Sequence, residues 1–357
     1  MINIDFLVAG CNTRCRHCYV NGGPGLRMPW EDALLCLKRL DTLAEFLPWE
    51  VSFTLDHEPM SHPEIHRILQ AASQTRHIQN YHHGMTTGVG LMHRKDRDAV
   101  VKTYLDCGYD VFGITIHGNK AHHDEIVRRT GAYDAAIEAA GFLKEMGARV
   151  EVSLMLNRFF PADAQAITHM LERLQPHWVG LAMPIFTPHH NCMDFEPYRA
   201  TLTDVKALWE VFPLWRQNRE EIMGQAENGT IAAGIRYLRD NPDLQSRFAA
   251  PQEELYLTLH PDCRLYVGNS GAETRCLGDL RSLDLEATAQ IIRELPGNRD
   301  YGAFYDPGTL PATEVLLDAL TRLPGELVYG DFESILYRGL AELGTATRIL
   351  KPERKDQ

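Results

Sequence analysis

Three cysteines near the start of the chain constrain it more than any other feature. Cys11, Cys15 and Cys18 are spaced C-x3-C-x2-C and directly follow an apolar run, Ile4 to Val8. Three thiolates on one loop can hold three irons of a cubane iron–sulfur cluster and leave the fourth iron open to a small chelating ligand. The spacing therefore predicts a cluster-binding loop after the first strand, where the open iron is the starting point of the chemistry.

The same triplet has three other interpretations: a disulfide pair with a spare thiol, a zinc site, or buried cysteines that only pack. Disulfides are rare without export, and the segment MINIDFLVAGC lacks the charged and apolar regions of a secretory signal. A structural zinc needs a fourth ligand. His17 is the nearest candidate, but it lies between two of the cysteines, where one loop can hardly wrap four groups around a metal.

The overall composition bounds the class of protein. With 357 residues and 44% hydrophobic content, the chain can bury one large core, with or without a small appendage. It contains no apolar run of about 18 residues, so we expect no membrane span. A formal net charge of −12 argues against a nucleic acid or an anionic membrane as the main partner. We therefore predict a cytoplasmic protein.

Up to about residue 187, short β-rich runs alternate with longer helical ones. The expected strands are Asn3–Ala9, Val51–Leu55, Tyr81–Thr86, Val111–His117, Arg149–Asn157 and Trp178–Pro184. The expected helices are Trp30–Glu45, Pro63–Ala72, Lys95–Leu105, Tyr133–Met146 and Ala162–Arg173. This alternation predicts an α/β fold, a partial (β/α)6 TIM-like barrel, whose site lies at the carboxyl ends of its strands.

We expect three regions along the chain: the barrel in residues 1–200, a helical linker in 201–255, and a small C-terminal α+β extension in 256–357. The linker is charged, and its apolar residues are Leu208, Trp209, Val211, Phe212, Leu214 and Trp215. The extension opens with a hairpin-like pair of strands around Pro261 and Asp262, followed by helix-like sequence.

Polar residues follow several of the expected strands. In DHEPMSHPEI, after the second strand, the carboxylate of Glu58 can bind a cationic amine, while Ser61 is good N-cap chemistry for the next helix. In MTTGVGL, after the third strand, Thr87 can bind a polar ligand or cap a helix. Ser153, Met155 and Asn157 share one face of the fifth strand, and a cofactor pocket can use all three.

The loop from Cys11 to Cys18 resembles the cluster-binding loop of the radical S-adenosylmethionine (radical SAM) superfamily, whose pattern is C-x3-C-x-aromatic-C. His17 stands at the aromatic position, which in that family lies near the adenine, and Tyr19 follows. The resemblance implies that Cys11, Cys15 and Cys18 hold a [4Fe-4S] cluster. It also implies that S-adenosylmethionine (SAM) chelates the open iron through its amino and carboxylate groups.

The resemblance continues at the next two strand ends. Glu58 and Pro59 match the last two residues of a Gly-Gly-Glu-Pro motif, so the resemblance implies that Glu58 contacts the SAM amino group. Asp56 and His57 replace the two glycines, which restricts the backbone of this turn. The segment around Thr87 resembles Thr-Asn-Gly, which implies a contact to the SAM carboxylate or ribose.

Residues 112–158 resemble a stretch of the SPASM and twitch group of this superfamily that reads Ser-x-Asp-Gly, His-Asp, an arginine and Gly-Ser-Phe. The matching positions are Thr115, His117, Gly118, His123, Asp124, Gly131 and Tyr133, and His117 replaces the aspartate. The resemblance implies that Thr115 contacts the ribose, and that Arg128 or Arg129 binds the SAM carboxylate with its forked guanidinium. His117 and Ser153 are expected in the same pocket.

The tail resembles SPASM and twitch domains more weakly, through the segment 277–280. Such domains ligate one or two further clusters with several cysteines. Here the cysteine expected near Gly268 is absent, and only Cys263 and Cys276 remain. Two thiolates do not fill the ligand set of a cubane cluster. We therefore predict a reduced domain of this kind, and one cluster in the whole chain.

The resemblance implies an enzyme that cleaves SAM reductively to a 5′-deoxyadenosyl radical and modifies a peptide or small molecule, with flavodoxin or ferredoxin as electron donor. One alternative is transfer of the 3-amino-3-carboxypropyl group of SAM to a nucleophile, with Cys192, Cys263 or Cys276 holding a thiophilic substrate. An alternative of another class is a non-catalytic iron–sulfur or zinc scaffold. The polar loop at 182–199, with His189 and His190, either lines a substrate site or is a solvated connection.

Overall fold

The computed structural model describes residues 1–18, 23–25, 27–187, 190–211, 219–243, 254–270, 273, 275–295 and 311–344. The predictions for Tyr19, His189, Phe212, Leu214 and Trp215, and for the side chains of His190 and Cys192, lie outside this part. Among the described residues, no helix combines the length and apolar character that crossing a bilayer requires.

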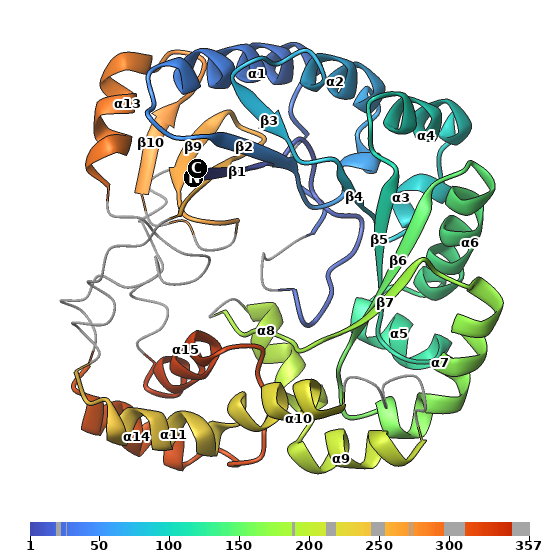
Figure 1. Ribbon diagram of the computed structural model, residues 1–357, viewed down its shortest axis with the longest axis vertical. Helices are drawn as coiled ribbons and strands as arrows, with labels where there is room; N and C mark the ends of the chain where they lie inside the picture. The colour runs from blue at the N-terminus through green and yellow to red at the C-terminus, as the bar shows by residue number, and fades with distance from the viewer. Residues whose placement is uncertain are drawn as a thin grey trace.

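Seven short strands form the arc of a partial barrel, with helices on its outer side (Figure 1). The strands are β1 (Ile2–Phe6), β2 (Val51–Leu55), β3 (Ile78–Asn80), β4 (His83–Met85), β5 (Val111–Ile116), β6 (Arg149–Met155) and β7 (Trp178–Ala182). The helices are α1 (Trp30–Glu45), α2 (Ile65–Ala72), α3 (Val89–Met92), α4 (Arg97–Asp106), α5 (Lys120–Val127), α6 (Ala132–Glu145) and α7 (Phe160–Leu174). The predicted partial TIM-like barrel is confirmed, because the paired strands of this arc are parallel.

The third strand differs from the prediction. Instead of one strand over Tyr81–Thr86, β3 pairs with β2 and β4 pairs with β5, so the arc consists of two sheets. The N–H of His83 donates to the carbonyl of Tyr81 at 2.9 Å, a three-residue turn that interrupts the strand. The ring of His82 packs against Tyr109, whereas His83 faces Glu151, as expected for neighbours on opposite faces.

The part after β7 adds helices and three strands. These are α8 (His190–Phe195), α9 (Leu202–Val211), α10 (Arg219–Asn228), α11 (Ile231–Asp240), β8 (Leu255–Leu259), β9 (Arg264–Val267), β10 (Arg275–Asp279), α13 (Leu285–Glu294), α14 (Thr313–Thr321) and α15 (Phe332–Glu342), with a short 3-10 turn at Glu196–Tyr198. Another 3-10 turn, Pro59–Ser61, lies earlier, between β2 and α2. The predicted hairpin is present as β8 and β9. β8 also pairs in parallel with β1, so the extension continues the barrel sheet.

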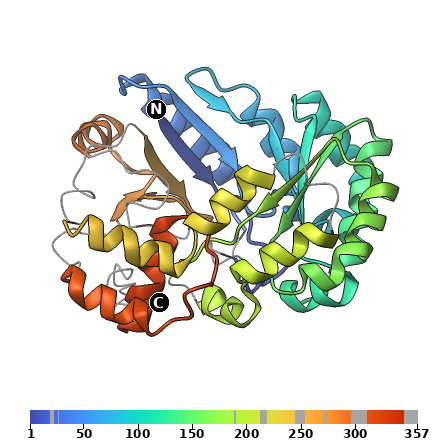
Figure 2. The ribbon, with the colours of Figure 1, turned by 60° about the horizontal axis from the view of Figure 1, so that its bottom comes forward.

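The C-terminal helices build a second, smaller core. Phe186, Ile231, Leu320 and Ile335 are fully buried there, and α11, α14 and α15 lie together across from β5 and β6 (Figures 1 and 2). The expected linker core is only partly correct. Leu208 and Trp209 are buried, but Val211 is 48% exposed. Two positions along a helix turn a side chain to the opposite face. The predicted regional boundaries at residues 200 and 255 stay predictions.

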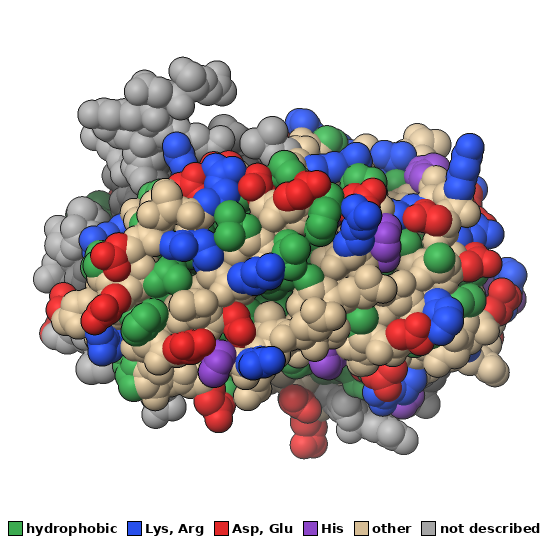
Figure 3. Space-filling model, turned by 90° about the horizontal axis from the view of Figure 1, so that it is seen from above, with side chains coloured by type: hydrophobic (Ala, Val, Ile, Leu, Met, Phe, Trp, Pro, Cys, Tyr) green, Lys and Arg blue, Asp and Glu red, His purple; other side chains and the backbone are tan. Residues whose placement is uncertain are grey.

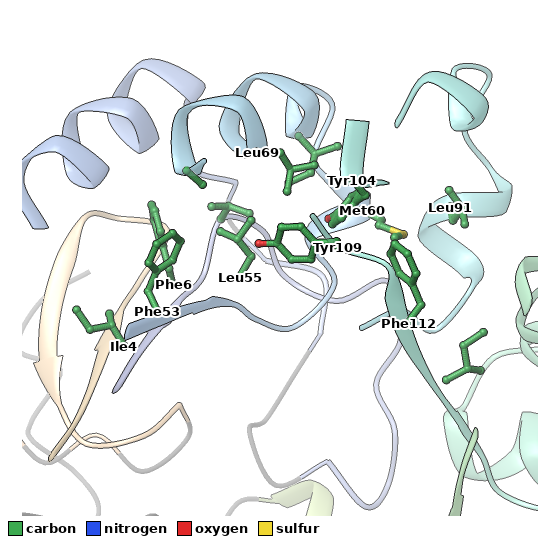
Figure 4. Close-up of a cluster of buried hydrophobic side chains, with 14 of the residues drawn as sticks. Ile4, Phe6, Phe53, Leu55, Met60, Leu69, Leu91, Tyr104, Tyr109 and Phe112 are labelled. Carbon is green, nitrogen blue, oxygen red and sulfur yellow. The ribbon is translucent and has the colours of Figure 1, made fainter. Parts of the chain in front are cut away.

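Strand alternation separates an apolar outer face from a polar inner face of the barrel. Ile4, Phe6, Phe53 and Leu55 point from β1 and β2 into the core that the helices cover (Figure 4). Their alternating neighbours are polar and only partly buried: Asn3, Asp5, Ser52 and Thr54. On the helical face above α1 and α2, acidic and basic side chains are intermixed (Figure 3).

Candidate functional site

The cysteine loop begins two residues beyond the buried segment that follows β1. A bridge between Ala9 and Arg27 joins its two ends, and Met28 donates its N–H to the carbonyl of Val8 at 3.0 Å. Gly10 lies at the narrowest point, where a Cβ would approach the carbonyl oxygen of Gly23 to 2.4 Å. The backbone crossing therefore needs glycine, and it fixes where the cysteines begin.

The three predicted cluster ligands form no disulfide and lie in one partly buried loop. The hydroxyl of Thr13 lies 3.1 Å from the sulfur of Cys11 and 3.4 Å from that of Cys15, and the N–H of Cys18 donates to the carbonyl of Cys15. Burial raises the pKa of Cys11 to about 12, with the carboxylate of Glu58 adding to the effect, and burial also raises the pKa of Cys15.

These pKa shifts test whether a cationic cluster fits the loop. Two buried thiols with raised pKa stay protonated unless a cation compensates the thiolate charge. Irons of a cluster supply that charge. In the described part of the chain, no three His, Cys, Asp or Glu side chains converge on a single metal ion. A four-iron cluster is wider than one ion, so its cysteines need not converge on a point. The donor set fits a cluster better than zinc.

Glu58 lies at the tip of β2 and is completely buried. One carboxylate oxygen accepts from the hydroxyl of Thr86 at 2.7 Å, and the other accepts from the N–H and the hydroxyl of Thr87, both at 2.6 Å. Burial raises the pKa of Glu58, and these hydrogen bonds oppose the shift. The structure thus brings two predicted site residues, Glu58 and Thr87, together in direct hydrogen bonds. Thr86 was missed by the sequence analysis.

Two helix caps that the sequence allows are absent. Ser61 does not cap α2, which follows Glu64 without a side-chain cap; its hydroxyl donates to the carbonyl of Gly10 at 3.2 Å instead. Thr87 does not cap α3, which follows Gly88 without a side-chain cap; its hydroxyl donates to Glu58 at 2.6 Å instead. In both cases the hydroxyl bonds a residue far away in the sequence and not the start of the following helix.

Three histidine rings form a column beside the cysteine loop. The ring of His17 lies 4.4 Å from that of His117, which lies 5.3 Å from that of His123. Burial lowers the pKa of His17 and His123 to about 4 and that of His117 far below its ordinary value. The column is therefore uncharged at neutral pH. His117, which replaces the family's aspartate, is 1% exposed, and its N–H donates to Nδ1 of His123.

The two candidate arginines have different partners. Arg129 donates from Nη1 to the carbonyl of Asn12 in the cysteine loop at 3.0 Å, whereas Arg128 forms an ion pair with Asp194 of α8. Both border a cavity of about 210 Å³ that Arg14 also lines. A neighbouring cavity of about 380 Å³ is lined by Gly10, Cys11, Asn12, Pro24, Gly25, Arg27 and Ser61.

The remaining predicted contacts lie on the inner face of the barrel. Thr115 and Ser153 are partners in the register of β5 and β6, and both side chains are partly buried. Asn157, just past β6, donates to the carbonyl of His117 at 2.8 Å and so holds the end of β5. The later cysteines are elsewhere: Cys263 is buried against Cys36, and Cys276 is exposed.

Comparisons with known proteins agree with this geometry. Residues 6–165 match the model of the radical SAM superfamily. Native anSMEcpe with bound AdoMet aligns with a TM-score of 0.55 at 10% identity, over 98% of this chain and 99% of that one. SuiB of Streptococcus suis, bound to precursor peptide SuiA, aligns with a TM-score of 0.53 at 12% identity, over 93% and 75%. No curated protein sequence matches the chain.

The two structural likenesses show a shared fold, and because they span nearly the whole chain, they include the C-terminal part. The family match covers the cysteine loop, Glu58 and the strands from β2 to β6. Residues 6–165 belong to the radical SAM superfamily, and the chain is an enzyme.

Proposed function

We propose that this enzyme holds one [4Fe-4S] cluster on Cys11, Cys15 and Cys18, and that it cleaves SAM reductively to a 5′-deoxyadenosyl radical for the modification of a peptide or small molecule. The observation that carries the proposal is the partly buried loop that holds Cys11, Cys15 and Cys18 at C-x3-C-x2-C spacing, next to the Glu58 turn. The cluster would supply the electron that breaks a carbon–sulfur bond of SAM.

The protein's part is to bind and orient SAM and to exclude water. Three of the roughly four acceptor sites of the Glu58 carboxylate are occupied by Thr86 and Thr87, which leaves one for an ammonium group. An ionised Glu58 is costly when buried, and a cationic amine offsets that cost. We therefore assign the SAM amino group to Glu58.

The uncharged rings of His17 and His117, which are tilted by 47° to each other, suit contact with the adenine. Neutral imidazole rings can stack on a base and do not repel the sulfonium charge nearby. Arg129, which is bonded to the cysteine loop, is the better placed arginine for the SAM carboxylate. We place the ribose near Thr115 and Ser153, on the inner face of neighbouring strands.

The inner face of the barrel also suggests the kind of substrate. Asn3, Asp5, Ser52 and Thr54 line it on one side, and the hydroxyl of Ser52 donates to Asn3 at 2.7 Å. Such a surface suits a polar substrate with hydrogen-bonding groups. The solved structures of anSMEcpe and SuiB include complexes with peptides. We propose a peptide as the first substrate class to test.

Each SAM cleavage consumes one electron, so an external donor is required. We propose a flavodoxin or ferredoxin, which as an acidic protein would approach the exposed arginines Arg14 and Arg27 beside the cysteine loop.

Product analysis tests the proposal. Anaerobically reconstituted protein with SAM and dithionite should form 5′-deoxyadenosine and methionine. Methylthioadenosine as the main product would replace the proposal by transfer of the aminocarboxypropyl group. No cleavage product at all, with cluster and SAM bound, would leave the non-catalytic scaffold as the better account.

A further inference from the structure

His57 has a backbone conformation that residues with a side chain rarely adopt. It lies two residues past the end of β2, and its φ angle is +66°. In this left-handed region a Cβ crowds the following carbonyl oxygen, so a residue other than glycine stays there only if its surroundings hold it. A glycine stands at this position in the motif that the turn resembles. Some other contact must therefore hold His57.

That contact comes from the C-terminal extension. Nε2 of His57 lies 2.9 Å from the hydroxyl of Ser270, a residue 213 positions away. Ser270 is 2% exposed, and its N–H donates to a carboxylate oxygen of Asp5 at 2.8 Å. Asp5 belongs to β1, and Ser270 lies shortly after β9. The bond therefore joins the turn after β2 to the C-terminal extension and to the strand that precedes the cysteine loop.

The surroundings of His57 keep its ring neutral. Burial lowers its pKa, the carboxylate of Asp56 acts in the opposite direction, and His260 adds to the lowering. His260 is itself bonded to Glu273 at 2.7 Å. A neutral ring has one N–H and one lone pair, and a serine hydroxyl can complement either at Nε2.

The same short turn is fixed at two further points. Glu58 accepts hydrogen bonds from Thr86 and Thr87, and Ser61 donates to the carbonyl of Gly10 beside the cysteine loop. Residues 56–61 are thus tied to the C-terminal extension, to the segment after β4 and to the cysteine loop. The first of these ties depends on His57.

We propose that His57 is a positioning residue for SAM: its bond to Ser270 holds the turn at 56–58 in the conformation that presents Glu58 to the SAM amino group. The inference rests on the proposed function. It gives the C-terminal extension a part in building the SAM site, although the extension's residue does not touch SAM.

The test compares Ser270→Ala, Ser270→Thr, His57→Gly and the double variant His57→Gly/Ser270→Ala. SAM affinity is measured by calorimetry on anaerobically reconstituted protein, with iron content determined in parallel. Ser270→Ala should weaken SAM binding about fivefold to tenfold, the equivalent of one hydrogen bond, at unchanged iron content. Ser270→Thr keeps the hydroxyl and should bind SAM as the wild type does.

His57→Gly separates the backbone from the hydrogen bond. Glycine relieves the crowding at positive φ, so the fold should be no less stable, yet SAM should bind about as weakly as in Ser270→Ala. The double variant should bind SAM no more weakly than His57→Gly alone, because both changes remove the same interaction. Gln175→Gly is the matched control, since Gln175 ends α7 with a φ of +47°. It should leave SAM affinity unchanged.

A second measurement does not depend on SAM. In the full-length apoprotein, amide hydrogen exchange at residues 56–61 should be faster in Ser270→Ala than in the wild type or Gln175→Gly. Unchanged exchange there, or wild-type SAM affinity in both Ser270→Ala and His57→Gly, would overturn the inference while the proposed function stood. Wild-type protein that bound no SAM would overturn the proposed function, and with it the role inferred for His57.

Discussion

Thr87 donates both its backbone N–H and its hydroxyl to one carboxylate oxygen of Glu58, each at 2.6 Å. The two residues follow different strands, β2 and β4, which belong to the two separate sheets of the barrel. Their bond therefore joins the sheets at the end where the cysteine loop lies. Thr87 thus orients the residue that we assign to the SAM amino group, and its own contact to SAM stays a prediction.

Thr87→Val should weaken this link without changing the shape of the side chain. Glu58 would lose one hydrogen bond in a buried site, which costs about 1–2 kcal/mol of unfolding free energy. Its pKa should rise further, because burial would be less opposed. We expect SAM affinity to fall about tenfold, measured by calorimetry. Thr87→Ser keeps the hydroxyl and is the control; equal losses in both variants would contradict the role of the bond.

Cys15→Ala should abolish the cluster and SAM cleavage together. Wild-type protein should contain about four irons per chain after anaerobic reconstitution, the content of one cubane cluster. Cys276→Ala should retain both iron and activity, because this exposed thiol is not expected to be a ligand. Iron analysis and product analysis check these outcomes. About eight irons per chain, or SAM cleavage by Cys15→Ala, would contradict the assignment of a single cluster to this loop.

His123 should make the fold sensitive to mild acid. Its pKa in the folded chain is about 4, below the ordinary 6.5, so its contribution to stability is present above pH 6.5 and is lost as the pH falls toward 4. This lowering of the pKa corresponds to about 3 kcal/mol of unfolding free energy. His123→Asn keeps an acceptor for the N–H of His117 and cannot titrate. Denaturant unfolding of the apoprotein should show a smaller loss of stability for His123→Asn between pH 6.5 and 4; an identical pH dependence would contradict the assignment.

The sequence predicted best what local patterns determine. The helix Trp30–Glu45 has the predicted bounds, because its apolar residues recur at helical spacing. The parallel barrel follows from the alternation of strands and helices, and the cysteine loop from its spacing. The interruption of the third strand was missed because residues 81–86 read as one β-rich run, and the turn at Tyr81 carries neither glycine nor proline to mark it.

The contacts that build the site depend on residues far apart in the sequence. Nothing local shows that Thr87 bonds Glu58, that Ser61 bonds Gly10, or that His57 is held by Ser270. The local sequence allowed Ser61 and Thr87 to cap a helix. In the structure the hydroxyl of each bonds a residue far away in the sequence instead. His57 at positive φ was equally hidden, since the loss of a glycine predicted a restricted turn but not the partner that holds it.

Arg129, rather than Arg128, should bind the SAM carboxylate. Arg129 is bonded to the carbonyl of Asn12, which lies between Cys11 and Cys15 in the chain, while Arg128 is engaged by the carboxylate of Asp194. A second carboxylate at Arg128 would have to compete with that ion pair. Hydrogen bonds to charged groups contribute about 1.5–3 kcal/mol, so Arg129→Gln should weaken SAM binding about tenfold to a hundredfold. Arg128→Gln is the matched control, with an expected effect of at most about threefold. Calorimetry at equal iron content compares the two, and a larger loss in Arg128→Gln would transfer the carboxylate to that residue.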